Sequence, residues 1–304
     1  MLKVSIRRGL AVLAAALFLV SGTIRADQPG TDEQSRKSEA KAAWDEAEKV
    51  AVQGPATVDL RDQAKLTLPD HTAFIPNPQA SRVMRALGNT VDADFIGLAV
   101  GQGNWLATID FIKEGYIKDD DAKNWNVDDL LDGLKKGTEA ANEDRKDRGF
   151  PALTLDGWIE KPNYDPTRHT LVWSVGGHDE GADPKSPQTV NYNTYLLGRD
   201  GYLSLDFITG SDEIAAGKPT ALALLNGLSF VPGKRYSDFN SNTDKIAAYG
   251  LAALVGGVVA KKLGLLALIG VFLAKFAKVG LVIAAGGLVA ARKFFGRLFR
   301  RNDA

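Results

Sequence analysis

The chain has 304 residues, of which 45% are hydrophobic and 24% are charged, with 37 basic and 37 acidic side chains. This length is enough for one or two domains, and the chain is too apolar to be disordered. Cysteine is absent, which excludes disulfides, thiolate metal sites and cysteine nucleophiles.

Charge is sorted along the chain although the formal net charge is zero. Residues 1–26 carry four basic side chains and no acidic one, and residues 246–304 carry nine basic side chains and one acidic. The remaining residues, 27–245, have 24 basic and 36 acidic side chains, a net charge of −12. An acidic body between basic, apolar ends argues against a nucleic-acid partner and indicates a membrane.

The first 26 residues have the form of a secretory signal peptide. Three basic residues precede an uncharged stretch at residues 10–20. As a helix this stretch is about 16 Å long, roughly half a bilayer core, so it is short for a permanent anchor. We expect cleavage after Ala26, with Gly22 as a second position and an uncleaved anchor as the alternative.

Residues 246–291 contain no acidic residue, proline, Ser, Thr, Asn or Gln. A continuous helix of these 46 residues is about 69 Å long, more than twice a bilayer core of about 30 Å. The stems of long basic side chains can bring their amines to the membrane interface. The charges in this stretch are Lys261, Lys262, Lys275 and Lys278. We therefore predict a membrane-embedded helical region with one or two spans, followed by a basic tail at residues 292–304.

The basic tail bears on the number of spans. If the body is exported, two spans return the tail to the outside, whereas basic flanks prefer the cytoplasmic side and favour an odd number. Small residues four apart, such as Gly270 and Ala274, allow close contact between helices in lipid. Self-association through this region is therefore a further possibility, although a stretch rich in Gly and Ala also produces such pairs by chance.

Turn signals divide the body into short runs that indicate strands and helices. A helical stalk or surface helix is predicted within residues 27–54, and one domain over residues 55–240. Strands are predicted as a hairpin within 56–68 and at 94–100, 104–112, 153–160, 168–175, 189–197, 202–208 and 228–231. Helices are predicted after the turn at 76–78, after Asn126 as far as residue 148, and after a cap at Ser211 as far as residue 225. This order predicts an α+β fold, an antiparallel sheet with helices packed on one face, plus a C-terminal transmembrane helical segment.

No pattern in the body specifies a catalytic, cofactor-binding or metal-binding residue, so we predict none. The carboxylate run at 119–121 lacks the alternating acids and the glycine of a calcium loop, and is expected to be a solvated turn before a helix. Residues 97–103 lack the G-K-[ST] of a phosphate loop and are expected to form a hairpin. The tryptophans predicted to lie in strands are expected in the core, and a ligand groove is the alternative. These tryptophans are Trp105, Trp158 and Trp173, and Trp125 would join them in a groove.

The three histidines, His71, His169 and His178, form no paired metal-ligand motif such as H-E-x-x-H. A hydrolytic group of His169 or His178 with Ser174 and Asp179 lacks the G-x-S-x-G elbow. We therefore expect these histidines in loops or at strand edges. An envelope hydrolase or metal-dependent enzyme that uses a histidine or the aspartate run is the alternative function.

Several stretches of the sequence together resemble one known family. They are residues 115–122 (GYIKDDDA), 157–158 (GW), 162–165 (PNYD), 197–201 (LGRDG), 236–239 (YSDF) and 244–250 (DKIAAYG). The chain resembles a bacterial family of membrane-anchored proteins, domain of unknown function 2167, over nearly its whole length after the signal. The resemblance implies an exported, anchored body and no established activity, cofactor or catalytic residue.

These features favour a non-enzymatic protein of the cell inner membrane whose acidic domain faces the periplasm. Its expected partners are the lipid bilayer, other envelope proteins, or a second copy bound through the membrane segment. A second alternative to this function is that the membrane segment itself is the working part, as an oligomer or channel.

Overall fold

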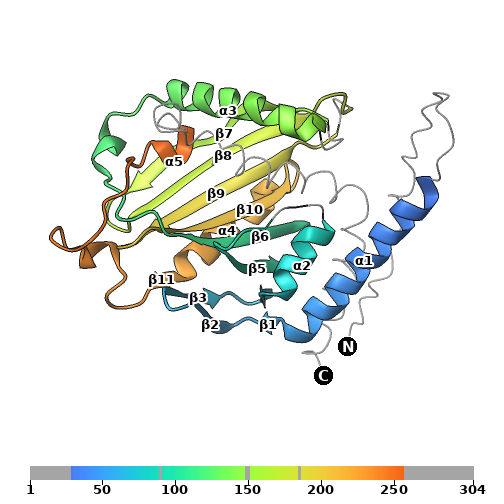
Figure 1. The fold of residues 1–304 in the computed structure, drawn as a ribbon, viewed down its shortest axis with the longest axis horizontal. Coiled ribbons are helices and arrows are strands. Elements are labelled where there is room, and N and C mark those ends of the chain that lie inside the picture. The colour runs from blue at the N-terminus through green and yellow to red at the C-terminus, as the bar shows by residue number, and fades with distance from the viewer. Residues whose placement is uncertain (1–28, 88, 90, 148–150, 184–185, 257–304) are drawn as a thin grey trace, which may run out of the picture.

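The computed structural model describes residues 29–256 except 88, 90, 148–150 and 184–185. The described strands form an eight-stranded sheet in the order β1-β4-β5-β6-β10-β9-β8-β7 and a three-stranded sheet in the order β11-β3-β2 (Figure 1). The strands are β1 (Val52–Gln53), β2 (Ala56–Leu60), β3 (Ala64–Leu68), β4 (Thr72–Pro76), β5 (Phe95–Gly101), β6 (Trp105–Ile112), β7 (Leu153–Asp165), β8 (Thr170–Asp179), β9 (Thr189–Leu197), β10 (Tyr202–Gly210) and β11 (Leu228–Phe230). The helices are α1 (Pro29–Val50), α2 (Gln79–Ala86), α3 (Val127–Asp147), α4 (Ile214–Gly227) and α5 (Ala253–Gly256), with 3₁₀ turns η1 (Asp120–Lys123) and η2 (Tyr236–Asp238). All strand pairs within both sheets are antiparallel, so the predicted α+β architecture is confirmed.

The predicted strands are present, but β1 and β4 were missed, and β7 and β8 continue beyond their predicted ends. Strand β4 lies inside the large sheet, and four of its five residues are buried, so it has no alternating pattern. Strand β7 continues to Asp165 and includes Pro162. It is the last strand of the sheet, where a proline without an N–H group is tolerated.

The predicted cap of α3 is present, whereas the predicted cap of α4 is not. The side chain of Asn126 accepts a hydrogen bond from the backbone N–H of Asp128 (3.0 Å), which confirms a cap on α3. The predicted cap at Ser211 is wrong, because its hydroxyl accepts from the backbone N–H of Gln188 (3.0 Å) and α4 begins after Glu213. Ser211 therefore ties the ends of β9 and β10 together instead.

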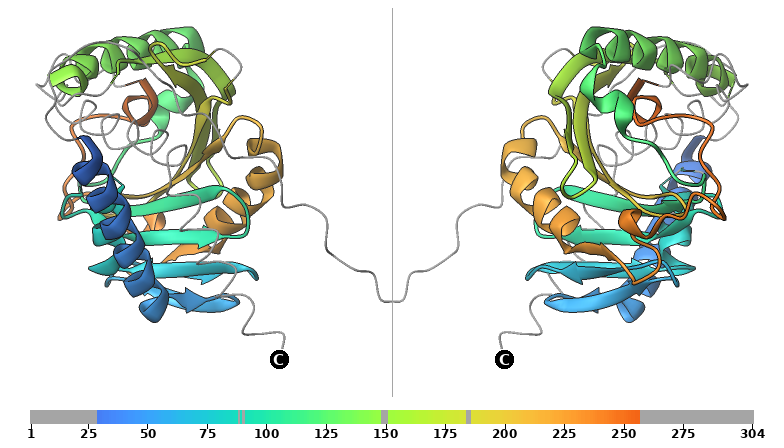
Figure 2. Two further views of the ribbon diagram at one scale, coloured as in Figure 1. Left: turned by 90° about the vertical axis from the view of Figure 1, so that its right-hand side faces the viewer. Right: turned by 90° about the vertical axis from the view of Figure 1, so that its left-hand side faces the viewer.

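Helices cover both faces of the large sheet, so the expectation of helices on one face is wrong. Successive side chains of β10 point to opposite faces of the sheet. Leu205 and Phe207 lie in a core cluster with residues of α4 and the small sheet. Ile208 lies on the other face, in a cluster with residues of α1 and α2. A third cluster lies among β8, β9, α3 and α5 and includes the buried Trp173 and Tyr195. Figure 2 shows the sheet curving strongly, with α4 outside the curve and α5 inside. Strands in the middle of the sheet are consequently apolar on both sides.

The helix predicted within residues 27–54 is present as α1, and its C-terminal half packs against the body. Ala43, Trp44 and Ala47 are buried in the cluster that contains α2. Arg82 of α2 pairs with Glu39 of α1 (2.8 Å). This part of α1 is therefore a surface helix of the domain and does not project as a stalk.

The folded body extends beyond residue 240, which corrects the predicted domain end and the start of the membrane region at 246. Ile246 forms a parallel bridge with Tyr116. Farther along, Ala247, Leu251 and Val255 are buried in the third core cluster. Residues 246–256 therefore pack as part of the domain. The sequence alone did not show this, because apolar side chains favour a protein core as well as lipid.

The rest of the predicted membrane region, residues 257–291, lies outside the described residues, as do the predicted signal peptide and the basic tail. Among the residues that the structure describes, no helix has both the length and the hydropathy needed to span a bilayer.

Leu251 and Ile246 provide a test of the revised boundary. Leu251 is fully buried, whereas Ile246 is 43% exposed. We expect Leu251→Ala to lower the free energy of unfolding by about 2–5 kcal/mol, because it leaves a cavity in the third core cluster. The matched variant Ile246→Ala should change it by less than about 1 kcal/mol. Urea unfolding of the full chain in detergent, followed by tryptophan fluorescence, measures both, and equal small effects would contradict the packing of this segment.

Candidate functional site

Segments that are far apart in the sequence meet beside the turn that joins β7 to β8. The ring of Tyr116 stacks on Tyr236 with centroids 4.3 Å apart and on Phe239 at 3.9 Å. The hydroxyl of Tyr236 donates a hydrogen bond to the backbone carbonyl of Ile117 (2.8 Å). These contacts join the loop after β6 to the segment around η2.

A carboxylate, a phenol and an imidazole form the centre of this region. The hydroxyl of Tyr164 donates to Oδ2 of Asp119 (2.6 Å) and lies 3.1 Å from Nδ1 of His169. The ring of His169 also packs on Tyr236, with centroids 4.1 Å apart. We call Tyr116, Asp119, Tyr164, His169 and Tyr236 the aromatic-carboxylate cluster.

The protonation of Tyr164 determines the polarity of the cluster. Burial, and then the hydrogen bond to Asp119, raise the pKa of Tyr164 far above its ordinary value of 10.0. The phenol is therefore neutral, and its hydroxyl donates to the Asp119 carboxylate. A phenol that is held neutral in this way is a hydrogen-bond donor and not a base.

The turn between β7 and β8 positions two members of the cluster. The carboxylate of Asp165 accepts hydrogen bonds from the backbone N–H groups of Thr167 (2.8 Å) and Arg168 (3.3 Å). His169 then adopts the left-handed conformation, with φ of 53°, which histidine tolerates better than most residues. This turn places the side chains of Tyr164 and His169 next to each other.

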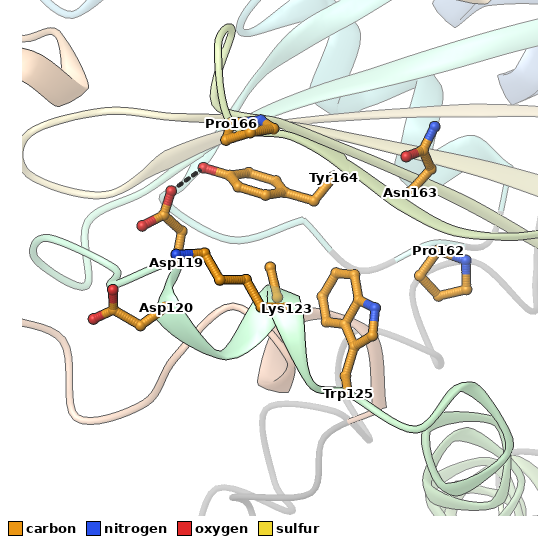
Figure 3. A pocket seen from close by; sticks show the side chains of 9 residues that line it. Asp119, Asp120, Lys123, Trp125, Pro162, Asn163, Tyr164 and Pro166 are labelled. Carbon is orange, nitrogen blue, oxygen red and sulfur yellow. Dashed lines mark hydrogen bonds between the residues drawn. The ribbon is translucent and has the colours of Figure 1, made fainter.

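A cavity of about 340 Å³ opens beside the cluster (Figure 3). The η1 segment contributes Asp119, Asp120, Ala122, Lys123 and Trp125 to its lining. The end of β7 and the turn after it contribute Pro162, Asn163, Tyr164 and Pro166. Figure 3 shows the rings of Tyr164 and Trp125 on opposite sides of the cavity. Two carboxylates and one ammonium group therefore share the lining with two aromatic rings.

The aspartate run predicted to be a solvated turn is mostly engaged, which corrects that expectation. Asp119 belongs to the aromatic-carboxylate cluster, and Asp120 borders the cavity. The carboxylate of Asp121 accepts hydrogen bonds from the backbone N–H groups of Leu251 (3.1 Å) and Ala252 (3.0 Å). Asp121 thus caps the turn that leads into α5. Leu251, the first residue that it binds in this turn, lies 130 residues farther along the chain.

Further contacts hold the chain where it enters this final segment. Tyr116 donates its backbone N–H to the carbonyl of Lys245 (2.8 Å) and accepts from the N–H of Ala247 (2.9 Å). Arg199 binds Asp244 through two hydrogen bonds of 2.7 Å. We call the contacts of Tyr116, Asp121 and Arg199 with residues 244–252 the exit anchor.

Gly115 shows how closely the two segments of the exit anchor approach. Its φ is +102°, and a Cβ at this position would lie 2.6 Å from the carbonyl oxygen of Lys245. A side chain is therefore excluded both by the backbone conformation and by the lack of space.

The alternative hydrolytic group of His169 or His178 with Ser174 and Asp179 does not assemble. His169 and His178 lie at opposite ends of β8, about 30 Å apart at the rise of an extended strand. Ser174 is fully buried between them. His178 pairs instead with Asp156 (2.9 Å), and His71 lies in the turn after Asp70 with φ of 57°. Among the described residues, no group of three or more His, Asp or Glu side chains is arranged to hold a metal ion.

The remaining candidates are in the expected kinds of structure. Residues 97–103 form the β5–β6 hairpin, as predicted. Trp105 and Trp173 are buried, and Trp158 packs edge-on against Trp173 at 6.0 Å. Trp125 lines the cavity. The four tryptophans thus form no common groove.

Sequence reasoning did not identify Tyr116, Tyr164 or Tyr236 as site residues. Each lies in a stretch on which the resemblance to a family rests, and this was the signal that marked them. No spacing pattern marks them, because the cluster is made by contacts between residues as far apart as Tyr116 and Tyr236, 120 positions.

Comparisons with known proteins agree with that resemblance. A family model described as a protein of unknown function (DUF2167) matches residues 52–286. No curated protein matches the sequence significantly. Among solved structures, the solution structure of cyanobacterial PsbP (CyanoP) from Synechocystis sp. PCC 6803 is similar over 60% of this chain and 91% of that chain, with 7% identity and a TM-score of 0.36.

The pair of Arg199 and Asp244 predicts a pH dependence of stability. The Arg199 guanidinium and the backbone N–H of Asn240 hold the pKa of Asp244 well below its ordinary value of 3.8. A group whose pKa is lower in the folded state stabilises the fold above its unfolded pKa, and this contribution is lost as the pH falls toward the folded value. We expect Asp244→Asn to lower the urea midpoint at pH 7, and the difference from the unmodified chain to shrink as the pH falls below 3.8.

Asp200→Asn is the matched control, because Asp200 pairs with Lys234 (2.9 Å) at a more exposed position. Its side chain is 28% exposed, whereas that of Asp244 is 7% exposed. The control should have the smaller effect. A difference for Asp244→Asn that is independent of pH would contradict the assigned role of the carboxylate.

Proposed function

The chain belongs to the DUF2167 family of proteins of unknown function, and we propose that it is a membrane-anchored cell-envelope protein with a non-enzymatic, interaction or structural role. In this proposal residues 1–26 direct export, and the acidic domain faces the periplasm. Residues 257–291 anchor the domain in the inner membrane. Other envelope proteins and the bilayer are the partners.

The observation that carries this proposal is the exit anchor. It fixes residues 244–252 against the body, and the buried Val255 lies just before the apolar sequence that begins at residue 257 and whose only charges are four lysines. The net charge of −12 over residues 27–245 opposes the basic character of both ends. A domain fixed in this way would sit close to the membrane surface and keep a constant orientation relative to its anchor.

The revised boundary also supports a single span. With residues 246–256 in the domain, the apolar sequence from 257 to 291 has a helical length of about 52 Å, which is short for two crossings of a core of about 30 Å with a turn between them. One span from a periplasmic domain places the basic residues 292–304 in the cytoplasm, in agreement with the positive-inside rule.

A topology map tests this proposal. Reporter fusions after Asn240 should give a periplasmic signal, and fusions after Ala304 should give a cytoplasmic signal. Protease added to intact spheroplasts should digest the domain and leave a cytoplasmic reporter after Ala304 intact, and detergent-opened cells serve as the control. A soluble cytoplasmic chain after fractionation would contradict the proposal, and a periplasmic C-terminus would contradict the single span.

One contact favours a second candidate, an envelope hydrolase or metal-dependent enzyme. His169 and Asp119 come together through Tyr164, with Nδ1 and Oδ2 3.8 Å apart. The high pKa of Tyr164 weighs against acid–base work by this group at neutral pH.

The two candidates are separated by comparing His169→Ala with the control His178→Ala in assays of ester, glycan and peptide hydrolysis on the full chain in detergent. On the non-enzymatic proposal, neither variant changes any rate. A rate that falls about 100-fold or more in His169→Ala alone, the scale of a lost general acid or base, would favour the enzyme.

A further inference from the structure

We propose that the cavity between η1 and β7 binds an organic ammonium group. This inference rests on the proposed interaction role and supplies the chemistry of the ligand for it. The site is defined by Trp125 and Tyr164 as aromatic walls and by Asp119 and Asp120 as the source of negative charge.

Two aromatic rings line the cavity. Trp125 and Tyr164 come from different segments and lie on opposite sides of the cavity (Figure 3). The electron-rich faces of such rings attract a cation within about 6 Å, and Trp is the strongest of the aromatic side chains in this respect. Pro162 extends the apolar lining beyond the rings, which suits the methylene or methyl groups next to a charged nitrogen.

The lining of the cavity also carries a net negative charge. Asp119 and Asp120 contribute two negative charges to the lining and Lys123 contributes one positive charge, so one charge is left for a ligand to neutralise. The hydroxyl of Tyr164 holds the Asp119 carboxylate in place at 2.6 Å. Because the pKa of Tyr164 is raised, its phenol is neutral. The hydrogen bond to Asp119 also holds the ring of Tyr164 in place.

The geometry suits a cation better than a neutral sugar or an anion. A sugar requires several convergent donors and acceptors. The hydroxyl of Tyr164 already donates to Asp119, and the polar groups that remain besides the aspartates are Asn163 and Lys123, both exposed at the surface. An anion would meet two carboxylates. A single ammonium group with an apolar substituent satisfies the carboxylates and the rings together.

An ammonium group reaches such a site from two sources, a free quaternary or primary amine or the side chain of a lysine in another protein. Choline and Nα-acetyl-lysine amide represent these two sources. Binding is measured by calorimetry with the full chain in a zwitterion-free, uncharged detergent. The control ligand is 3,3-dimethylbutan-1-ol, which has the shape of choline without its charge.

We expect at least one of the two ammonium compounds to bind, and to bind at least about tenfold more tightly than the uncharged control, with an affinity that falls as salt is added. Tighter binding of choline identifies a free amine as the source, and tighter binding of the lysine derivative identifies a protein side chain. Equal binding of the uncharged control, or no binding of either cation at millimolar concentration, would overturn the proposal.

Variants locate the binding. Trp125→Ala should weaken it about five- to tenfold, the loss expected for one ring at a partly desolvated cation. Asp120→Asn tests the charge without relying on a change in packing, and it should reduce both the affinity and its dependence on salt. Asp132→Asn removes an exposed carboxylate of α3 outside the cavity and is the matched control. Unchanged binding in both cavity variants would overturn the site, whereas a failed topology map with intact binding would overturn only the proposed anchoring.

Discussion

The carboxylate of Asp121 is the constraint on which the end of the domain depends. It lies in a short 3₁₀ turn between the large sheet and α3, and it accepts the backbone N–H groups of Leu251 and Ala252. Hydrogen bonds to a charged acceptor are stronger than those between neutral groups. Together with the pair of Arg199 and Asp244, this contact makes the last described residues part of the sheet domain and not a free linker.

The same short segment also builds the candidate site. Asp119, two positions before Asp121, is fixed by Tyr164, and Trp125 follows four positions later. The aromatic-carboxylate cluster, the cavity and the exit anchor are therefore parts of one unit. A ligand in the cavity would contact Asp119 and Asp120, which directly precede Asp121 of the exit anchor.

Much of the fold could be predicted from the sequence because its signals are local. The β9–β10 hairpin follows from the turn at residues 198–201, and α3 follows from the cap at Asn126 and the spacing of Leu130 and Leu134. Strand β4 was missed because burial on both faces removes the alternation by which strands are recognised.

The domain end and the site could not be predicted in the same way. Leu251 and Val255 resemble membrane residues because a protein core and a bilayer select the same side chains, and only the tertiary fold separates the two. The contacts of Tyr164 with Asp119 and of Asp121 with Leu251 join residues 45 and 130 positions apart, and no periodicity encodes such pairs. The charges of the cavity were visible in the sequence, but their grouping with Trp125 and Tyr164 was not.

The most direct test of the account is hydrogen exchange of the backbone amides of residues 246–256 in the full chain, in detergent and in lipid bilayers. We expect Ala247, Leu251 and Ala252 to exchange slowly in both, at rates close to those of β10, because their N–H groups are bonded to Tyr116 and Asp121. Fast exchange in detergent with protection that appears only in the bilayer would show that this segment belongs to the membrane, and would contradict the account.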